Sequence, residues 1–220
     1  MIYRRGSRGE MVKQIQRALA GAGLRVIDDG IYGIITEEAV KTFQREHGLK
    51  ADGIVGPATI AKLFPMRFRK SKRTITDIVV HCTATKSGVD YTVNDIRKWH
   101  KNRGFSDIGY HYVVNLHGEI LEGRDIDIMG AHVSGHNAHS IGVVYIGGIN
   151  QYGACADTRN NAQKAALMSL LMDLRKLYPK AKISGHRDFS PDLNGNGTVE
   201  PSEWIKECPC FDAKAEYKKI

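Results

Sequence analysis

The sequence has no apolar run long enough to cross a bilayer, no HExxH pair and no recognisable signal peptide. A membrane-spanning helix needs about 20 predominantly apolar residues in succession. The first residues, Met1 to Gly6, include two arginines and contain neither an apolar core nor a cleavage site. We therefore expect a protein made in the cytosol, which would need a separate exit route to act outside the cell.

Cysteine is also sparse, with four in 220 residues. An even count in a secreted chain would suggest a disulfide framework. Cys208 and Cys210, however, flank a single proline, which places them too close together for an easy mutual bridge. We predict reduced cysteines at any functional site and at most one incidental disulfide.

What the sequence does have is positive charge, with a formal net charge of +8 and an isoelectric point near 9.3. A basic surface suits a polyanion such as nucleic acid, an acidic membrane face, or a cell wall that carries carboxylates and phosphates. Plain solubility explains the same charge, so charge alone does not choose among these. The apolar fraction of 42% is enough for a real core, in one large domain or two small ones.

The sequence pattern of residues 1–64 predicts a small domain of three helices. Thr36 precedes two glutamates, as at the start of a helix, and Pro57 occupies a first-turn position of another. The segments 29–33 and 52–56 both read Asp-Gly-Ile-x-Gly and both precede a predicted helix, which makes a weak internal repeat. In each copy Asp-Gly is expected to form the turn.

Residues 65–73 contain five basic residues and predict a solvated linker that favours an anionic polymer, with nucleic acid as the alternative. Residues 74–220 then alternate strand and helix patterns. Thr92 and Asp95 suggest a capping box at a helix start. We expect an α/β domain with a mixed central β-sheet flanked by helices.

Three residues of the types that zinc prefers are scattered along this second domain: His81, His186 and Cys208. Three protein ligands leave a fourth position open for water, which is the catalytic arrangement. A single His or Cys is more often structural, so these residues alone do not prove a metal site. Cys82 could instead be a thiol nucleophile, but strand residues alternate faces, so its side chain should point away from that of His81.

The stretches that carry these residues resemble the zinc-dependent N-acetylmuramoyl-L-alanine amidases, the family of phage amidase-type lysozymes and peptidoglycan recognition proteins. The matching stretches, in the family's order, are 80–85, 96–100, 109–112, 118–124, 130–132, 137–143, 185–187 and 206–209. They cover nearly all of residues 74–220. Residues 1–64 resemble the three-helix peptidoglycan-binding domain of many wall hydrolases, because Phe43-Gln44 and Gly48-Leu49 lie between the two Asp-Gly copies.

The resemblance implies a hydrolase that cuts the amide between N-acetylmuramic acid and L-alanine, with zinc on the three residues above. It assigns catalytic roles to Tyr110 and Lys206, since a phenol can donate to the water or the intermediate and an ammonium can stabilise an oxyanion or deliver a proton. It places His132 at a substrate contact, with Asn137 nearby.

The expected protein is a phage-type endolysin or another lytic wall amidase, released by a separate membrane-lesion protein of the holin kind. The alternatives are a cytosolic amidase that recycles soluble muropeptides and a protein that recognises wall without cutting it. We expect a monomer that binds peptidoglycan and has no nucleic-acid partner.

The segment 192–203 has the spacing of an EF-hand calcium loop. Oxygen ligands stand at the first, third, fifth and twelfth positions and glycine at the sixth, and a backbone carbonyl is expected at the seventh. We predict a structural calcium site, with a simple Asn/Gly-rich turn as the alternative. Its residues are Asp192, Asn194, Asn196, Gly197, Thr198 and Glu203.

Overall fold

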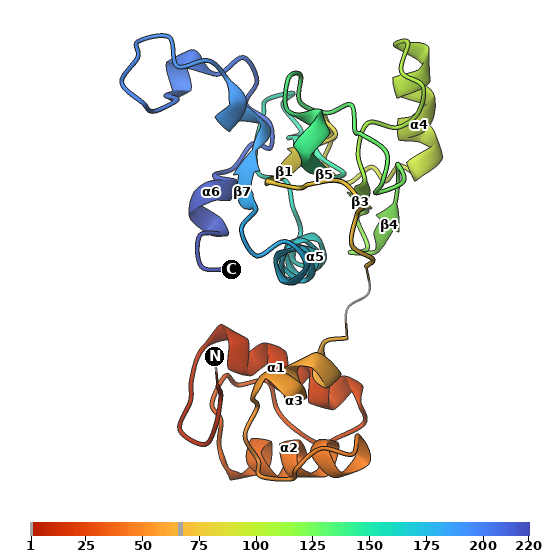
Figure 1. Cartoon of the computed structure of the whole chain (residues 1–220). Helices are drawn as coiled ribbons and strands as arrows, with labels where there is room; N and C mark the ends of the chain where they lie inside the picture. Colours follow the sequence, from red (N-terminus) through yellow and green to blue (C-terminus); the bar gives the residue numbers. More distant parts are fainter. Residues whose placement is uncertain (1, 66–67) are drawn as a thin grey trace. The chain divides into compact units, whose positions relative to one another are not determined.

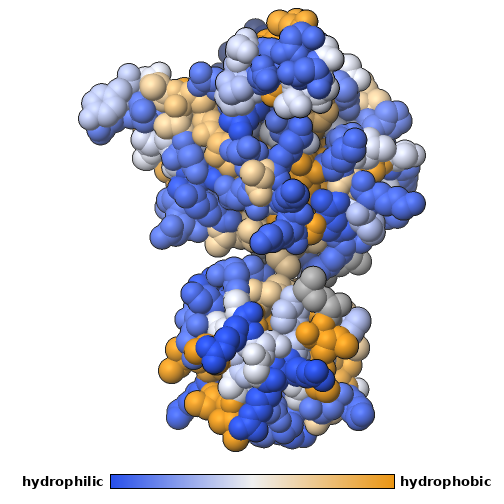
Figure 2. Space-filling view, turned by 90° about the vertical axis from the view of Figure 1, so that its left-hand side faces the viewer, coloured by the Kyte–Doolittle hydropathy of each residue, from blue (hydrophilic) through white to orange (hydrophobic). Residues whose placement is uncertain are grey.

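The computed structural model describes residues 2–65 and 68–220, and the chain divides into two compact units between residues 67 and 68 (Figure 1). Met66 and Arg67 of the predicted linker lie outside the described residues. No helix in the described part of the chain is long and apolar enough to cross a membrane. Hydrophilic residues cover most of the face shown in Figure 2.

The first unit consists of three helices, as predicted: α1 (Glu10–Gly21), α2 (Ile34–Glu46) and α3 (Pro57–Leu63). Their apolar faces meet in one core, which includes Val12, Ile15, Leu19, Val40 and Phe43. Gly30 and Gly53 adopt positive φ angles of 77° and 70° in the two Asp-Gly turns. Glycine adopts this backbone conformation without a steric penalty.

Each copy of the internal repeat contacts a buried glutamine, and the two glutamines make equivalent sets of hydrogen bonds. The Gln16 amide donates to the Asp29 side chain, to a backbone carbonyl and to the Thr36 hydroxyl, at 2.8 to 3.0 Å. Gln44 makes the same three kinds of bond one repeat later, to Asp52, to the Ile54 carbonyl and to Thr59, at 2.9 to 3.0 Å. The sequence pattern predicted the two turns but did not predict that these glutamines stabilise them by hydrogen bonds.

The second unit is built on a five-stranded mixed sheet in the order β4-β3-β5-β1-β7. All neighbouring strands run parallel except β3 and β4, which form an antiparallel pair. The strands are β1 (Asp77–Cys82), β3 (Tyr112–Val114), β4 (Ile120–Glu122), β5 (Ser140–Tyr145) and β7 (Lys182–Gly185), and a separate small pair joins β2 (Thr85–Lys86) to β6 (Gly148–Ile149).

Helices cover both faces of the sheet, which confirms the predicted fold class (Figure 1). The helix α5 (Asn161–Leu177) packs its leucines against Ile78, Val80 and Val143. The helix α4 (Val93–Asn102), which begins with the predicted capping box, packs on the opposite face against Val113 and Val144. Shorter elements are α6 (Ala213–Glu216) and the 3-10 turns η1 (Asn137–His139), η2 (His186–Phe189) and η3 (Pro201–Glu203).

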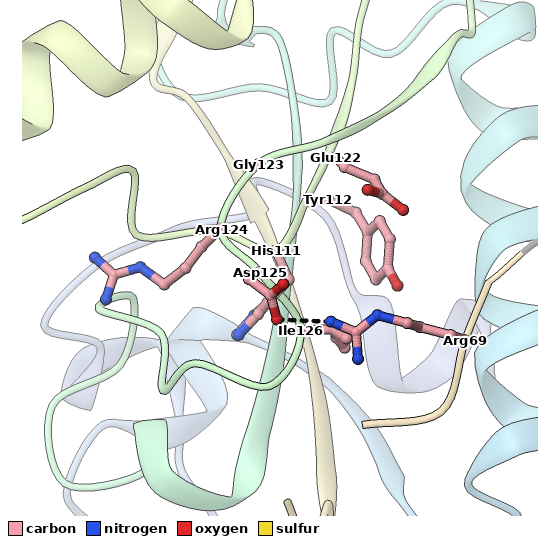
Figure 3. Close-up of a pocket in the computed structure, with 8 residues that line it drawn as sticks. All are labelled: Arg69, His111, Tyr112, Glu122, Gly123, Arg124, Asp125 and Ile126. Carbon is pink, nitrogen blue, oxygen red and sulfur yellow. Dashed lines mark hydrogen bonds and ion pairs between the residues drawn. The ribbon is translucent and has the colours of Figure 1, made fainter. Parts of the chain in front are cut away.

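Residues 68–73 do not form the solvated tether that the sequence predicted. Ser71 is buried, and its hydroxyl donates to the carbonyl of Ile126 at 2.8 Å. The Arg69 guanidinium pairs with Asp125 and Asp127, each at 2.7 Å, and lines a hollow of about 240 Å³ (Figure 3). The side chains of Arg69 and Arg73 therefore find acceptors on the second unit itself, because carboxylates and carbonyls face this segment.

Candidate active site

The three predicted zinc ligands meet at the carboxyl end of two adjacent strands. β1 carries His81 near its end, and β7 pairs with β1 in parallel and leads directly into His186. Cys208 reaches the same place from the segment before α6, where its Sγ accepts the backbone N–H of Cys82 at 3.3 Å. Parallel pairing is what brings together residues more than one hundred positions apart.

Two of the three spacings between the predicted ligand atoms match those around a tetrahedral zinc ion. The Nδ1 atoms of His81 and His186 are 3.2 Å apart, and the Sγ of Cys208 is 3.7 Å from Nδ1 of His81. Ordinary zinc bond lengths in a tetrahedron place two nitrogens about 3.4 Å apart and a nitrogen and a sulfur about 3.6 Å apart. All three ligand atoms lie within 4.8 Å of one another.

The protonation of the site also suits a metal. Burial, helped by neighbouring His132 and His186, holds the pKa of His81 well below its ordinary value. Burial and the charge of Lys206 lower the pKa of His186 to about 4. Both imidazoles are therefore neutral near pH 7, which is the form that ligates metal. A hydrogen bond with Cys82 and burial raise the pKa of the Cys208 thiol, so a metal must displace its proton on binding.

His132 lies directly behind His81. Its Nδ1 is 3.1 Å from Nε2 of His81, and its own Nε2 is 3.3 Å from the hydroxyl of Ser140. This contact holds the His81 ring so that Nδ1 faces the other two ligands, as outer partners of metal-bound histidines do. The predicted substrate contact of His132 stays a prediction, and the sequence did not reveal its contact with His81.

Asn137, the other predicted substrate residue, begins the turn η1. Its side-chain oxygen accepts the backbone N–H groups of His132 and Val133, at 2.8 and 2.9 Å. These bonds fix the loop that carries His132. Asn137 and His132 line the same cavity as the predicted metal ligands His186 and Cys208, a position from which both could contact a substrate.

Tyr110 and Lys206, the predicted catalytic pair, also line this cavity, whose volume is about 750 Å³. The Tyr110 ring lies 5.1 Å from the His81 ring, and burial raises its pKa, so the phenol stays a proton donor. Lys206 is exposed and forms no ion pair with any described residue. Its charge is close enough to lower the pKa of His186.

The cysteines separate as the alternation of strand faces predicts. Cys82 belongs to the core on the α5 side of the sheet, together with Ile78 and Val80. Cys82 is nevertheless also one of the residues that line the cavity. Cys155 and Cys210 form a disulfide, while Cys82 and Cys208 remain free thiols. The sequence analysis allowed for one disulfide but did not identify its two cysteines, which are 55 residues apart in the sequence.

In the segment 192–203, backbone N–H groups donate hydrogen bonds to carboxylate side chains of the same segment. Asp192 accepts three backbone N–H groups within the loop, and Glu203, which is buried, accepts three more. Glu200, at the ninth position of the loop, accepts bonds from the amides of Asn194 and Asn196. The sequence reasoning missed Glu200, although the ninth position of a calcium loop supplies a ligand, often through water.

Comparison with known proteins matches both units. The family model "Putative peptidoglycan binding domain" matches residues 8–63, and "N-acetylmuramoyl-L-alanine amidase" matches residues 71–203. The endolysin of Klebsiella phage KP32 is 38% identical over 154 residues, covering 70% of this chain and 92% of that protein. The endolysin of Escherichia phage T7 is 36% identical over 154 residues, covering 70% and 93%.

Solved structures agree. The Ph2119 endolysin, from a bacteriophage of Thermus scotoductus, aligns with a TM-score of 0.52 and 26% identity over 68% of this chain and 86% of its own. The endolysin amidase LysCS from Clostridium intestinale aligns with a TM-score of 0.51 and 25% identity over 70% and 91%. Because the amidase match spans more than half of the chain and the phage relatives are covered almost completely, this chain belongs to the N-acetylmuramoyl-L-alanine amidase family.

Proposed function

We propose that this peptidoglycan amidase is zinc-dependent, cuts the amide between N-acetylmuramic acid and L-alanine, and acts as a phage-type endolysin. The observation that carries the proposal is the convergence of His81, His186 and Cys208 at zinc-ligand spacing. It is supported by the cavity beside them and by the endolysin relatives.

Zinc in this site would lower the pKa of a water molecule and polarise the scissile carbonyl. Tyr110 would donate its phenolic proton in a hydrogen bond to the carbonyl oxygen as negative charge develops there. Lys206 would offset the same charge through its ammonium, or pass a proton to the leaving nitrogen. His132 would keep the His81 ring in place throughout. The exposed position of Lys206 leaves its side chain free to reach substrate.

The first unit would hold the enzyme on polymeric wall. A second binding site on the same chain raises the effective concentration of the enzyme at its substrate. This favours action on intact peptidoglycan over recycling of soluble muropeptides. We further propose synthesis in the cytosol, release by a holin-type membrane lesion, and action as a monomer.

Mass spectrometry of digested sacculi tests the reaction. Free stem peptides that begin with L-alanine, with intact glycan, are expected. Cleaved glycan or cleaved stems would refute the bond assignment, and an unchanged sacculus would favour the alternative of a wall-recognition protein without activity.

Metal removal tests the zinc. Chelation should abolish hydrolysis and added zinc should restore it, whereas Cys82→Ser should remain active because its side chain faces the α5 core. Full activity of the metal-free protein would refute zinc dependence.

We also propose that the loop Asp192–Glu203 binds calcium as a structural ion. Its support is the spacing of the oxygen ligands and a third carboxylate, Glu200, on the same loop. The loop joins the segment of His186 to that of Cys208, so an ordered loop would hold both in register. Ions that bind only the folded state stabilise it by mass action.

Calorimetric titration of the zinc-loaded protein with calcium is the test. Calcium should release or absorb heat, raise the melting temperature and change the fluorescence of Trp204, which directly follows Glu203. Asp192→Ala should remove all three effects and leave zinc content unchanged. No heat and no shift in melting at millimolar calcium would leave the loop a simple connector.

A further inference from the structure

Lys206, the proposed catalytic cation, lies on a short exposed stretch of chain. Residues 205–207 are exposed, whereas Trp204 and Cys208 at the two ends of the stretch are partly buried. The side chain of Lys206 lines the cavity together with the predicted ligand His186. A lysine ammonium sits on a flexible four-carbon stem, so it reaches a defined place only if the backbone beneath it is held. The contacts at the two ends of this stretch therefore decide where the ammonium lies.

One residue, Arg187, contacts both ends of the stretch. Its backbone N–H donates to the carbonyl of Cys208 at 2.8 Å. Its guanidinium carbon lies over the Trp204 ring, 4.1 Å from the ring centre. Guanidinium groups bind the faces of aromatic rings in this way. The side chain of Arg187 thus holds one end of the stretch and its backbone holds the other, with Lys206 between them.

No hydrogen bond to a described residue orients the Trp204 ring. Its Nε1 is buried and has no partner among those residues. The Arg187 side chain is only 12% exposed, and its guanidinium is paired with Asp212 at 3.6 Å. A cation that is shielded from water binds an aromatic face more strongly than an exposed cation does. Loss of the guanidinium should therefore release the Trp204 ring.

A second contact with the same turn limits how far the stretch can move. The backbone N–H of Ile205 donates to the hydroxyl of Ser190 at 3.0 Å, and Ser190 directly follows η2, the turn that contains Arg187. This bond and the backbone bond to Cys208 do not involve the Arg187 side chain. Removal of that side chain should therefore shift the Lys206 backbone without detaching the predicted zinc ligand.

We propose that Arg187 is a positioning residue for Lys206, because its stack on Trp204 fixes the backbone from which the Lys206 side chain enters the cavity. The inference rests on the proposed function, since it requires Lys206 to act in catalysis. Arg187 does not itself line the cavity, so it acts through Lys206 and not on the substrate.

Arg187→Ala tests the inference with a soluble N-acetylmuramoyl tetrapeptide as substrate. The kcat should fall about 10- to 100-fold, as expected when a reacting group is misplaced by about 1 Å. The KM should stay near that of wild type, because no substrate contact is lost. Zinc content by atomic absorption should stay unchanged, because the backbone bond to Cys208 remains. Arg187→Lys should recover part of kcat, since an ammonium also binds an aromatic face.

The same substitution in a Lys206→Ala background separates positioning from general structural damage. If Arg187 acts through Lys206, Arg187→Ala should lower kcat no further once the ammonium is gone. Trp204→Ala removes the other half of the stack, so it should reproduce both results without relying on the arginine variant. A merely structural role would lower kcat by the same factor in both backgrounds and would overturn the inference.

Arg69→Ala is the matched control and should behave as wild type. Arg69 is also an arginine paired with carboxylates of the second unit, at 2.7 Å, but it lines a different hollow.

The outcomes distinguish the inference from the function on which it rests. A wild-type kcat in Arg187→Ala, or loss of zinc from that variant, would overturn the inference while Lys206→Ala still shows a lowered kcat. A wild-type kcat in Lys206→Ala would refute the proposed catalytic role of Lys206 and the inference with it.

Discussion

Removing the His132 imidazole should weaken zinc binding rather than substrate binding. The structure places His132 behind His81, with 3.1 Å between Nδ1 of His132 and Nε2 of His81. His132 is only 8% exposed, so water does not readily replace its ring. His132→Ala leaves Nε2 of His81 without its partner and frees the His81 ring to rotate away from the metal.

The size of the effect follows from the burial of this contact. A buried polar group that loses its hydrogen-bond partner costs about 1 to 3 kcal/mol. Loss of an outer partner of a metal ligand typically weakens metal affinity about 10- to 100-fold, or about 1.4 to 2.7 kcal/mol. The two ranges agree, so a zinc dissociation constant raised about 10- to 100-fold is expected.

Competition with a chromogenic zinc chelator measures this constant directly. His132→Gln should recover part of the affinity, because an amide can hydrogen-bond to the His81 ring. His139→Ala is the control, since His139 is exposed and bonds to the carbonyl of Thr74, not to His81. A zinc affinity equal to that of wild type, together with a raised KM for a muropeptide, would refute this reasoning and support the substrate contact that the resemblance implies.

Three further predictions concern catalysis, stability and the first unit. Tyr110→Phe and Lys206→Ala should each lower kcat about a hundredfold or more while atomic absorption finds the zinc content unchanged, because neither is a ligand; loss of metal would contradict these roles. The free energy of unfolding of the metal-free protein should fall as the pH falls from about 6.5 to about 4. Burial lowers the pKa of His100 and of His111 to about 4 in the folded protein. In this pH range the unfolded chain therefore binds a proton at each of these histidines and the folded protein does not, so a fall in pH favours the unfolded chain. This stabilisation is fully present above the unfolded pKa and amounts to at most about 3 kcal/mol per histidine. Urea unfolding followed by the fluorescence of Trp99 and Trp204, both in the second unit, should show it, and equal stability at pH 7 and pH 5 would exclude it. Removal of residues 1–64 should weaken pull-down on insoluble peptidoglycan but spare hydrolysis of a small muropeptide; equal pull-down would remove the proposed binding role.

The sequence determined what depends on neighbours along the chain. The three-helix unit, the Asp-Gly turns and the capping box at Thr92 follow from local propensity and hydrogen bonding within a few residues. The opposite orientations of His81 and Cys82 follow from the period of a strand. The side-chain types of the predicted metal ligands could also be read from the sequence, because imidazole and thiol groups are recognisable wherever they occur.

Only the tertiary structure decided which distant residues meet. The parallel pairing of β1 with β7 places His186 against His81, and no local pattern specifies that pairing. For the same reason the His132 contact, the disulfide partner of Cys210 and the docking of residues 68–73 escaped the sequence reasoning. The basic run looked like a tether because the carboxylates and carbonyls that bind it lie more than fifty residues away, and only the folded chain brings them within hydrogen-bond reach.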